Sequence, residues 1–286
     1  MVTNEDKKNL SYCTVIIWYN PSQSDIINTH DLAELISCVL VVDNSERSNS
    51  SQIKKANIQY YSLHKNLGIA TALNYGFQKA YEQGYEYALS LDQDSNFNRH
   101  DLRKFEKYAS KLFEDPFTAI VAASLENYGK IKEPLIKKTN ITSGSMTSLN
   151  AWKTVGRFKD SFFIDHVDHE FCWRLIRKNF IIYQLPDVSM KHKLGNPQTR
   201  KLFGKTYESP GYSADRYYYY YRNRLYLAKY RNEPYSKVYA FLWRKACRVL
   251  MVEDSRFLKL FAMISGTIHF HQKKVGKRGQ TVFFID

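Results

Sequence analysis

The sequence predicts an α/β fold in which a mixed, mainly parallel sheet is flanked by helices and followed by a helical extension. Over the first hundred residues, short apolar runs rich in β-branched side chains alternate with longer helical stretches. This alternation is typical of parallel sheets, whose strands are buried on both faces and joined by helices. From about Ala214 onward the pattern is helical.

The first hundred residues contain four predicted strands. The first spans residues 12–19 and is closed by Asn20-Pro21, and a helix over residues 24–37 follows with Ser24 as its N-cap. The other predicted elements of this part are strands at residues 38–42, 58–62 and 87–91 and a helix over residues 69–83.

The middle of the chain is less regular. The predicted elements there are a strand at residues 117–123, a helix beginning near Asn150, a second helix over residues 169–178 and a strand at residues 181–185 that ends at Pro186. Residues 126–139 look like a loop. Residues 195–212 are rich in Gly, Pro, Lys and Arg and are predicted to form a second loop.

The charge of the chain favours an anionic partner. At 286 residues it is long enough for one large domain, or one domain with a substantial appendage, and it carries 42 Lys and Arg against 28 Asp and Glu, a net charge of +14. Nucleic acid, anionic lipid and phosphorylated small molecules all satisfy this charge. Four cysteines without a Cys-x-x-Cys pair predict reduced thiols in a cytosolic protein.

The sequence contains no recognisable membrane-targeting segment. Residues 1–10 are polar and charged and the apolar run that follows is short, so we expect no signal peptide. No stretch approaches the ~20 apolar residues that span a bilayer. We therefore expect a cytoplasmic protein that is either soluble or peripheral on the inner face of the cytoplasmic membrane.

Acidic residues stand at the ends of two predicted strands. Asp43 follows residues 38–42, and Asp92 and Asp94 follow residues 87–91. Because ligands of open α/β sheets bind at the carboxyl ends of the strands, we expect these side chains to converge on one crevice. Two carboxylates two residues apart can hold one hard cation and leave positions open for phosphate oxygens. A helix cap or an ordinary turn is the alternative interpretation.

Residues 162–174 (FFIDHVDHEFCWR) hold the densest cluster of ionisable groups. A carboxylate in such a cluster can have a raised pKa and act as a general base. A solvated helix start, with its acids stabilised by the helix dipole, is the alternative. A zinc site formed by His166, His169 and Cys172 fits helical spacing but lacks the usual ligand set.

The C-terminal part of the chain is basic. Residues 237–278 contain ten Lys or Arg against Glu253 and Asp254, interleaved with apolar groups. This composition predicts a basic amphipathic surface for anionic lipid headgroups. A helical cap with a solvated outer face is a second interpretation, and the two are compatible.

Taken in order, several segments resemble the family-2 inverting glycosyltransferases of the GT-A fold, and among them the bacterial rhamnosyltransferases. These segments lie between residues 12 and 230 and are VIIWYNP (15–21), VVDNS (41–45), NLGIATALNYG (66–76), GYEYALSLDQDS (84–95), SGSMTSLNAWKTVGRF (143–158), FFIDHVDHEFCWR (162–174) and YYYYRNRLYL (218–227). The LDQDS and FIDHVDHEFCWR forms point to rhamnosyl transfer. The Gln-x-x-Arg-Trp signature of processive synthases is absent from the sequence, so we expect addition of one or a few sugars.

The resemblance implies a Rossmann-like catalytic domain over residues 1–230 and a basic helical extension over residues 231–286. Within the catalytic domain, Asp168 occupies the place of the family's catalytic base. The usual Glu-Asp pair reads Val167-Asp168 here, so this assignment depends on the Cys-Trp-Arg register downstream, with Asp165 and Glu170 as substitutes.

The resemblance also implies the ligands of the donor. Asp94 and Asp92 are expected to hold a divalent cation, Mn²⁺ or Mg²⁺, together with His192, which matches a late histidine of the family. The expected donor-binding residues are Asn20, Asp43, Asn66, Gly68, Asn74, Asp92 and Arg222. The acceptor-side candidates are Ser143, Gly144, Asp165, Glu170 and Trp173.

The implied activity is that of a hexosyltransferase (EC 2.4.1.-) in cell-surface polysaccharide synthesis. We expect it to transfer L-rhamnose from dTDP-β-L-rhamnose to a hydroxyl of a lipid-linked saccharide at an anionic membrane surface. A UDP-sugar donor is the alternative within the family. A basic nucleic-acid-binding protein is the alternative of another class, but the sequence holds no recognised nucleic-acid-binding module.

Overall fold

The computed structural model describes residues 10–125, 133–191, 197–202, 204–280 and 282–283. The chain forms two compact units. The first comprises residues 1–158 and 171–192, and the second comprises residues 159–170 and 193–286. The sequence predicts a boundary near residue 230, between a catalytic domain and an extension. This boundary divides the chain by function, and it stays a prediction.

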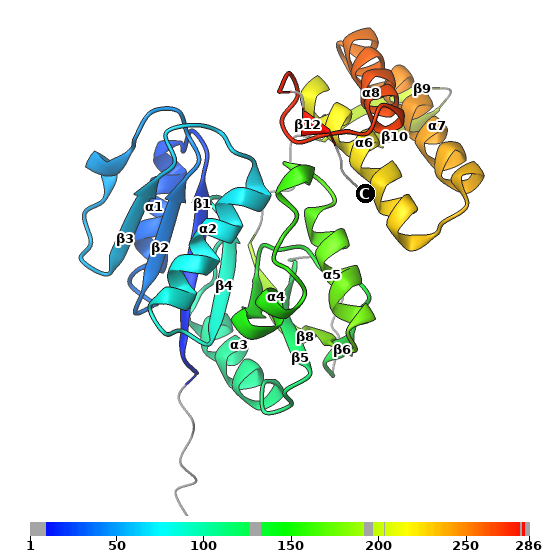
Figure 1. The fold of residues 1–286 in the computed structure, drawn as a ribbon. Helices are drawn as coiled ribbons and strands as arrows, with labels where there is room; N and C mark the ends of the chain where they lie inside the picture. Colours follow the sequence, from blue (N-terminus) through cyan, green and yellow to red (C-terminus); the bar gives the residue numbers. More distant parts are fainter. Residues whose placement is uncertain (1–9, 126–132, 192–196, 203, 281, 284–286) are drawn as a thin grey trace, which may run out of the picture. The chain divides into compact units, whose positions relative to one another are not determined.

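The first unit is built on an eight-stranded mixed sheet with the strand order β3-β2-β1-β4-β7-β5-β8-β6 (Figure 1). Its parallel part consists of β1 (Tyr12–Trp18), β2 (Val39–Asp43), β3 (Ile58–Ser62) and β4 (Tyr87–Asp92). These four strands confirm the predicted α/β fold. β1, β2 and β4 are mainly apolar because helices cover both faces of the sheet. The edge strand β3 is more polar and half-buried.

Helices pack on both faces of this sheet. Residues of α1 (Gln23–Leu32) and α3 (Arg99–Leu112) share one apolar core with Ile16 and Trp18 of β1. The helix α2 (Ile69–Glu82) packs on the other face, where a Cβ atom on Gly76 would lie 2.4 Å from the side chain of Val15. The alternation of side chains along β1 therefore serves both layers.

The first helix begins earlier than predicted. Its N-cap is Ser22, not Ser24, because the Ser22 side chain accepts a hydrogen bond from the Asp25 N–H while the Asp25 carboxylate accepts one from the Ser22 N–H. This reciprocal arrangement is a capping box. The helix ends at Leu32, five residues before the predicted end at Ser37.

The second half of the sheet departs further from the prediction. Its strands are β5 (Thr118–Leu125), β6 (Leu135–Ile136), β7 (Ser145–Ser148) and β8 (Ile181–Met190), and its helices are α4 (Leu149–Thr154) and α5 (Val167–Arg177), the latter beginning in the second unit. The helix α3 and the strands β6 and β7 were not predicted. The strand β8 does not end at Pro186, because an irregularity in its register with β5 accommodates the proline.

The second unit is mainly helical. Its long helices are α6 (Ala214–Arg231), α7 (Tyr235–Val252) and α8 (Arg256–His271), which confirms the helical pattern predicted from Ala214 onward. The helices α6 and α8 cross closely, because a Cβ atom on Gly266 would lie 2.3 Å from the Tyr218 carbonyl oxygen. Further short elements are η1 (Ser50–Gln52) in the first unit and η2 (Asp160–Phe162), β11 (Lys274–Val275) and β12 (Val282–Phe283) in the second.

Part of the predicted loop over residues 195–212 is a β-hairpin. The strands β9 (Gln198–Leu202) and β10 (Lys205–Ser209) pair antiparallel, and Gly204 at their turn has a φ of 73° that glycine adopts without strain. The composition was misleading because charged side chains suit an exposed two-stranded ribbon as well as a loop.

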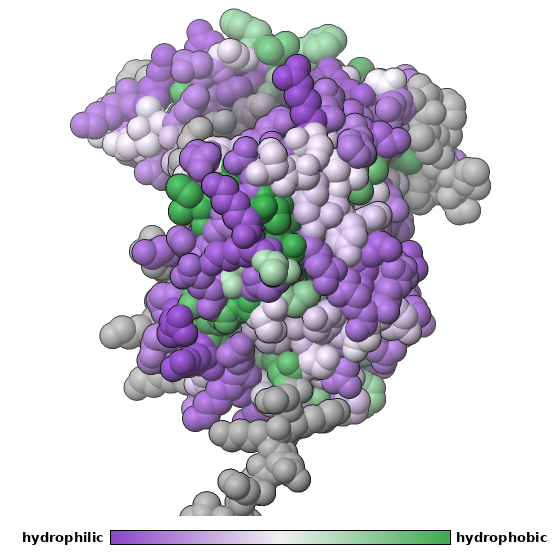
Figure 2. Space-filling view, turned by 90° about the vertical axis from the view of Figure 1, so that its left-hand side faces the viewer, coloured by the Kyte–Doolittle hydropathy of each residue, from purple (hydrophilic) through white to green (hydrophobic). Residues whose placement is uncertain are grey.

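Two surface properties complete the description of the fold. Within the described ranges, no helix is both long and apolar enough to cross a membrane. Hydrophilic residues cover most of the face that Figure 2 shows, and the hydrophobic residues on that face form small separate patches.

Candidate active site

The Asp92-Gln93-Asp94 segment forms a tight turn directly after β4. The Ser95 N–H donates a hydrogen bond of 3.0 Å to the Asp92 carbonyl oxygen and closes the turn. In the parallel ladders, Asp92 pairs with Ile17 of β1, and Asp43 pairs with Trp18. The two predicted acidic positions therefore lie at the carboxyl ends of strands on either side of β1, as the order of elements predicts.

The turn is held from α1 and from the end of β1. The Asn28 amide donates to the carbonyl oxygens of Gln93 and Ser95, at 2.9 and 2.8 Å. The Gln93 side chain accepts a hydrogen bond of 2.8 Å from the Tyr19 N–H and donates one of 3.1 Å to the Asp25 carboxylate. Sequence reasoning missed Gln93 and Asn28, although the position of Gln93 between the two aspartates was a signal for the former.

The residues Ser143 and Gly144 hold the turn from the other side. The Ser143 hydroxyl accepts a hydrogen bond of 3.0 Å from the Asp92 N–H and lies 2.7 Å from the Ser95 hydroxyl oxygen. The Gly144 N–H donates to the Ser90 carbonyl oxygen at 2.8 Å. Of these two acceptor-side candidates, Ser143 therefore positions the backbone of the acidic turn, and Gly144 pairs with the strand that precedes it.

The Asp43 carboxylate organises the loop after β2. Its Oδ2 atom accepts hydrogen bonds from the Asn49 N–H, the Asn49 amide and the Tyr60 hydroxyl, and its Oδ1 atom accepts one from the Ser45 N–H. Each carboxylate oxygen has two lone pairs, so acceptor capacity is left at Oδ1. Asp43 is fully buried, and four donors compensate the cost of burying its charge.

The start of α2 is tied to the same strand ends. The Asn66 side-chain oxygen accepts hydrogen bonds from the Gly68 N–H and from the Asn44 amide, whose own oxygen accepts from the Leu67 N–H. Gly68 is the N-cap of α2 with a φ of 87°. The Asn20 N–H donates to the Ser45 hydroxyl at 2.7 Å. The predicted residues Asn20, Asn66 and Gly68 thus belong to one connected set of loops.

The two carboxylates of the turn suit a divalent cation. Among the described residues, no group of three or more His, Cys, Asp or Glu side chains is arranged to hold a metal. His192 lies outside the described residues, and its neighbour Lys191 pairs through its backbone with Asn96. Two carboxylates fit Mg²⁺ or Mn²⁺ where substrate phosphates supply further oxygens, because such ions are commonly held by one or two carboxylates plus phosphate.

Two predicted residues of the first unit have contacts that stabilise its packing. The Asn74 side chain accepts hydrogen bonds from the Trp152 indole and the Phe158 N–H and donates one to the Phe158 carbonyl oxygen. Trp173 on α5 has the guanidinium of Arg177 over its ring, 5.0 Å from the centroid. Donor binding by Asn74 and acceptor binding by Trp173 stay predictions.

In the second unit, Asp168 pairs with His169 at the start of α5. The Asp168 Oδ1 atom accepts a hydrogen bond from the His169 N–H and lies 2.7 Å from the His169 Nδ1 atom. Burial raises the pKa of Asp168, but the hydrogen bonds and charge of His169 outweigh it and lower the pKa below its ordinary value. Burial conversely lowers the pKa of His169, and Asp168 reverses that shift to a net increase. Asp168 is therefore an ionised carboxylate, as a general base requires.

The pKa of the neighbouring Asp165 is shifted in the opposite direction. Burial raises its pKa to about 6, although Arg216, whose Nε atom lies 3.3 Å from the carboxylate, opposes the shift. Phe163, Asp165 and His166 all have φ values between 61° and 63°, in the left-handed region that costs energy for residues other than glycine. The Asn223 amide donates to the Phe162, Ile164 and Asp165 carbonyl oxygens and holds this segment in place.

Three further side chains lie in or beside this cluster. Burial lowers the pKa of His166 to about 3, and neither ring nitrogen has a hydrogen-bond partner among the described residues. Glu170 is fully buried, with the Lys159 ammonium 3.9 Å away. The Arg222 guanidinium donates to the carbonyl oxygens of Gly276 and Ser161 inside the unit. Its predicted role in donor binding has no support from these contacts and stays a prediction.

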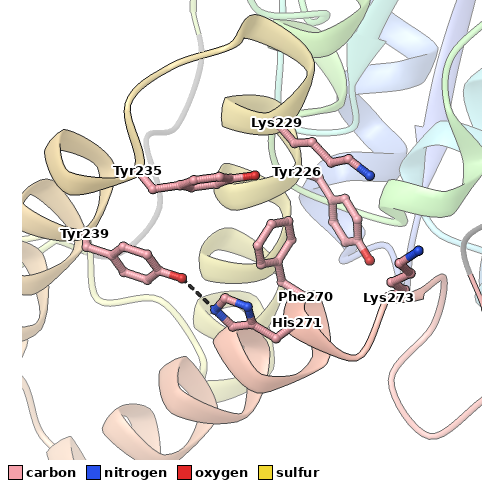
Figure 3. A pocket seen from close by; sticks show the side chains of 7 residues that line it. All are labelled: Tyr226, Lys229, Tyr235, Tyr239, Phe270, His271 and Lys273. Atoms are coloured by element: carbon pink, nitrogen blue, oxygen red, sulfur yellow. Dashed lines mark hydrogen bonds between the residues drawn. The ribbon is translucent and has the colours of Figure 1, made fainter. Parts of the chain in front are cut away.

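A separate hollow of about 340 Å³ lies in the second unit, between α6, α7 and α8 (Figure 3). The aromatic rings of Tyr226, Tyr235 and Phe270 lie close together, and the Tyr226 and Phe270 centroids are 4.9 Å apart in an edge-to-face arrangement. Lys229 and Lys273 add positive charge at one side, as Figure 3 shows. Flat apolar rings next to cations can bind a sugar that carries phosphate.

Comparison with known proteins shows the family of this chain. The family model described as glycosyl transferase family 2 matches residues 14–181, more than half of the chain. The chain belongs to glycosyl transferase family 2. The matched residues include Asp43, Asp92, Asp94 and Asp168. Arg222 lies beyond them.

Two curated relatives are similar to this glycosyltransferase over most of its length. The dTDP-rhamnosyl transferase RfbF of Shigella flexneri is 28% identical over 249 residues, which cover 79% of this chain and 82% of that protein. The low-salt glycan biosynthesis hexosyltransferase Agl10 of Haloferax volcanii is 26% identical over 215 residues, which cover 65% and 69% of the two chains. The chain is therefore a glycosyltransferase.

Solved structures of other glycosyltransferases have the same fold. A crystal structure of GalNAc-T7 with UDP, GalNAc and Mn²⁺ superposes with a TM-score of 0.57 at 13% identity, covering 78% of this chain and 48% of that one. S. aureus TarS (residues 1–349) superposes with a TM-score of 0.51 at 15% identity, covering 91% and 71%. This chain thus spans about half of the GalNAc-T7 chain, and at these identities the likeness concerns the GT-A fold.

Proposed function

We propose that this glycosyltransferase is metal-dependent and inverting, and that it transfers L-rhamnose from dTDP-β-L-rhamnose. The observation that carries the proposal is the acidic turn at the end of β4. Its backbone is held by Asn28, Gln93 and Ser143 beside the buried Asp43. Such rigid positioning is what a diphosphate site requires, because the ligands must already be placed when the leaving group departs.

The donor side of the proposal consists of residues at the strand ends. Asp92 and Asp94 would hold Mn²⁺ or Mg²⁺, and His192 is a proposed third ligand. A bound cation would neutralise the charge of the departing nucleoside diphosphate. Asp43 and the loop that it organises form the proposed nucleotide side. The crystallised GalNAc-T7 complex with UDP and Mn²⁺ supports a cation of this kind for the GT-A fold.

Asp168 is the proposed base that removes the proton of the acceptor hydroxyl. Its low pKa leaves the carboxylate ionised, and the Nδ1 atom of His169 is in position to hold it in one orientation. Asp168 takes the proton from the acceptor hydroxyl as the oxygen attacks the anomeric carbon. A single displacement of this kind inverts the configuration, so a β-linked donor gives an α-linked rhamnoside. Asp165, whose pKa burial raises to about 6, is the alternative base in this proposal.

The proposed acceptor is a lipid-linked saccharide at an anionic membrane surface. Such a molecule carries both sugar rings and phosphate, and the hollow in Figure 3 offers aromatic rings and two lysines. The similarity to the dTDP-rhamnosyl transferase RfbF supports the donor part of this proposal. The basic helical region over residues 231–286 would act at the inner face of the cytoplasmic membrane.

The test is a panel of sugar nucleotides offered to the purified enzyme with Mn²⁺ or Mg²⁺. We expect release of nucleoside diphosphate with dTDP-β-L-rhamnose, and stabilisation against heat by dTDP in preference to UDP. Turnover with a UDP-sugar alone would replace the rhamnosyl proposal by the other donor class. Binding of DNA or RNA without any response to sugar nucleotides would overturn the glycosyl-transfer proposal for this site.

A further inference from the structure

The outer face of α8 carries a continuous apolar stripe, here defined as Phe257, Phe261, Ile264 and Ile268. The exposed fractions of these four residues are 73%, 65%, 50% and 47%, which is exceptional for aromatic and branched aliphatic residues. Leu258 at the border of the stripe is 62% exposed. Large exposed apolar patches usually mark an interaction site.

The stripe is a property of the whole helix. Its members are four, three and four residues apart, so at 3.6 residues per turn they lie within about 60° of one another around the helix axis. The buried residues of α8 include Ala262, Met263 and Gly266, on the opposite side of the helix. The packing of α8 on α6 at Gly266 therefore uses one face and leaves the stripe to solvent.

The segment of the chain that carries the stripe is basic, and the Arg256 guanidinium lies over the Phe257 ring, 5.5 Å from its centroid. Residues 237–278 contain ten Lys or Arg and only two acids. One of these acids, Glu253, is buried and bonded to Lys259, Ser209 and Tyr217. Only Asp254 then remains exposed to offset Lys237, Arg244, Arg248, Arg256 and Lys273, which are all exposed. Positive charge next to an apolar face complements a surface that has anionic groups outside and an apolar layer under them.

We propose that α8 lies in the plane of an anionic lipid bilayer, with Phe257, Phe261, Ile264 and Ile268 inserted among the lipid chains. The basic residues of α7 and α8 then contact the headgroups. A second copy of the chain is the less favourable occupant, because a symmetric contact would bring one basic surface against another. In this arrangement α8 does not cross the bilayer, because no helix among the described residues is long and apolar enough to do so.

This inference deepens the proposed membrane partner but does not depend on the donor or the reaction. Vesicle binding can therefore be measured on the full-length enzyme without any substrate. Activity with a water-soluble saccharide acceptor reports on the catalytic site alone. An error in the proposed membrane contact would therefore appear in vesicle binding, and an error in the proposed reaction would appear in turnover.

The experiment is sedimentation with vesicles of phosphatidylcholine that contain 30 mol% phosphatidylglycerol, a composition chosen to be about as anionic as a cytoplasmic leaflet. The triple variant Phe257→Ser/Phe261→Ser/Ile264→Ser should lose about 100-fold in partition coefficient, because three large apolar groups are no longer buried. The matched control is Ile27→Ser/Phe117→Ser/Ile136→Ser, which removes three exposed apolar groups of the first unit. The partition coefficient of this control variant should stay within about threefold of that of the wild type.

A second variant tests the electrostatic part without touching the stripe. Arg244→Glu/Arg248→Glu should weaken binding to anionic vesicles by about fivefold or more for each residue, and raised salt should reduce the difference. Both stripe and charge variants should keep wild-type turnover on the soluble acceptor. Equal vesicle binding by the stripe variant and wild type would overturn the inference. A second outcome would also overturn it. In that outcome analytical ultracentrifugation shows a dimer for the wild type and a monomer for the stripe variant, and neither protein binds vesicles.

Discussion

The Ser143 hydroxyl oxygen lies 3.0 Å from the Asp92 backbone nitrogen and accepts its hydrogen bond. The two residues are far apart in sequence, and the contact joins the loop before β7 to the acidic turn after β4. The strand β7 runs antiparallel between β4 and β5, so this loop returns to the carboxyl end of β4. The backbone of the proposed metal turn is thus positioned by a strand that the sequence did not predict.

Ser143→Ala is expected to raise the metal concentration needed for half-maximal turnover several-fold. The variant loses the hydrogen bonds of the Ser143 hydroxyl to the Asp92 N–H and to the Ser95 hydroxyl, each worth about 1 kcal/mol, so Asp92 and Asp94 are positioned less firmly. Titration of turnover with Mn²⁺ measures the effect. Ser124→Ala is the matched control, because Ser124 is an equally buried serine that bonds the Leu185 carbonyl oxygen instead. Identical metal titrations for the two variants would contradict the role of Ser143.

Asp168→Asn is expected to reduce turnover by about 10³-fold while binding of the donor persists, because the amide cannot accept the acceptor proton. Turnover is measured by release of nucleoside diphosphate, and donor binding by calorimetry. Asp215→Asn removes an exposed carboxylate of the same unit, paired with Arg278, and should leave turnover within about twofold of wild type. Near-normal turnover of Asp168→Asn would show that another residue is the base.

His169→Phe is expected to move the acid limb of the pH–rate profile to higher pH. The base must be ionised, so turnover falls as pH drops through the pKa of Asp168. In the wild type His169 keeps that pKa below its ordinary value, and without the imidazole burial raises it. The profile of turnover between pH 4 and 8 measures the shift. His100→Phe on α3 is the control, and an unshifted limb in His169→Phe would refute the pairing.

Asp165→Asn is expected to change the pH dependence of stability. Burial raises the folded pKa of Asp165 to about 6, so the folded state binds the proton more tightly than the unfolded chain does. Its contribution is fully present below the ordinary pKa of aspartate and is lost as pH rises towards 6. The wild type should therefore lose about 2 kcal/mol relative to the variant between pH 4 and 7. Urea unfolding at several pH values tests this, and a constant difference would contradict the raised pKa.

Removal of divalent cations is expected to stop transfer. EDTA should abolish turnover and Mn²⁺ or Mg²⁺ should restore it, because two carboxylates without a cation would repel the diphosphate. Asp94→Asn should need at least about tenfold more metal for half-maximal turnover, since a charged ligand is lost. Asp31→Asn on the exposed surface of α1 is the control and should behave like wild type. Transfer that resists the chelator would refute the metal proposal.

The parallel half of the sheet could be predicted from the sequence because β1, β2 and β4 are mainly apolar runs and helical segments separate the strands. The predicted strand at residues 58–62 coincides with β3, and the helix predicted from residue 69 begins there. The antiparallel half was harder. The strand β7 is only four residues long and contains two serines and a threonine, which favour strands only once neighbouring strands bury them. The register irregularity that carries β8 past Pro186 likewise depends on its pairing with β5.

For the candidate site, the sequence by itself determined which carboxylates stand at strand ends, because strand order and apolar pattern place Asp43, Asp92 and Asp94 there. Only the tertiary structure decided what surrounds them. Gln93 and Ser143 act through hydrogen bonds to residues distant in sequence, and the pKa values of Asp165 and Asp168 move in opposite directions although the two residues are three positions apart. Burial and partners set such properties, and they arise only when the chain has packed.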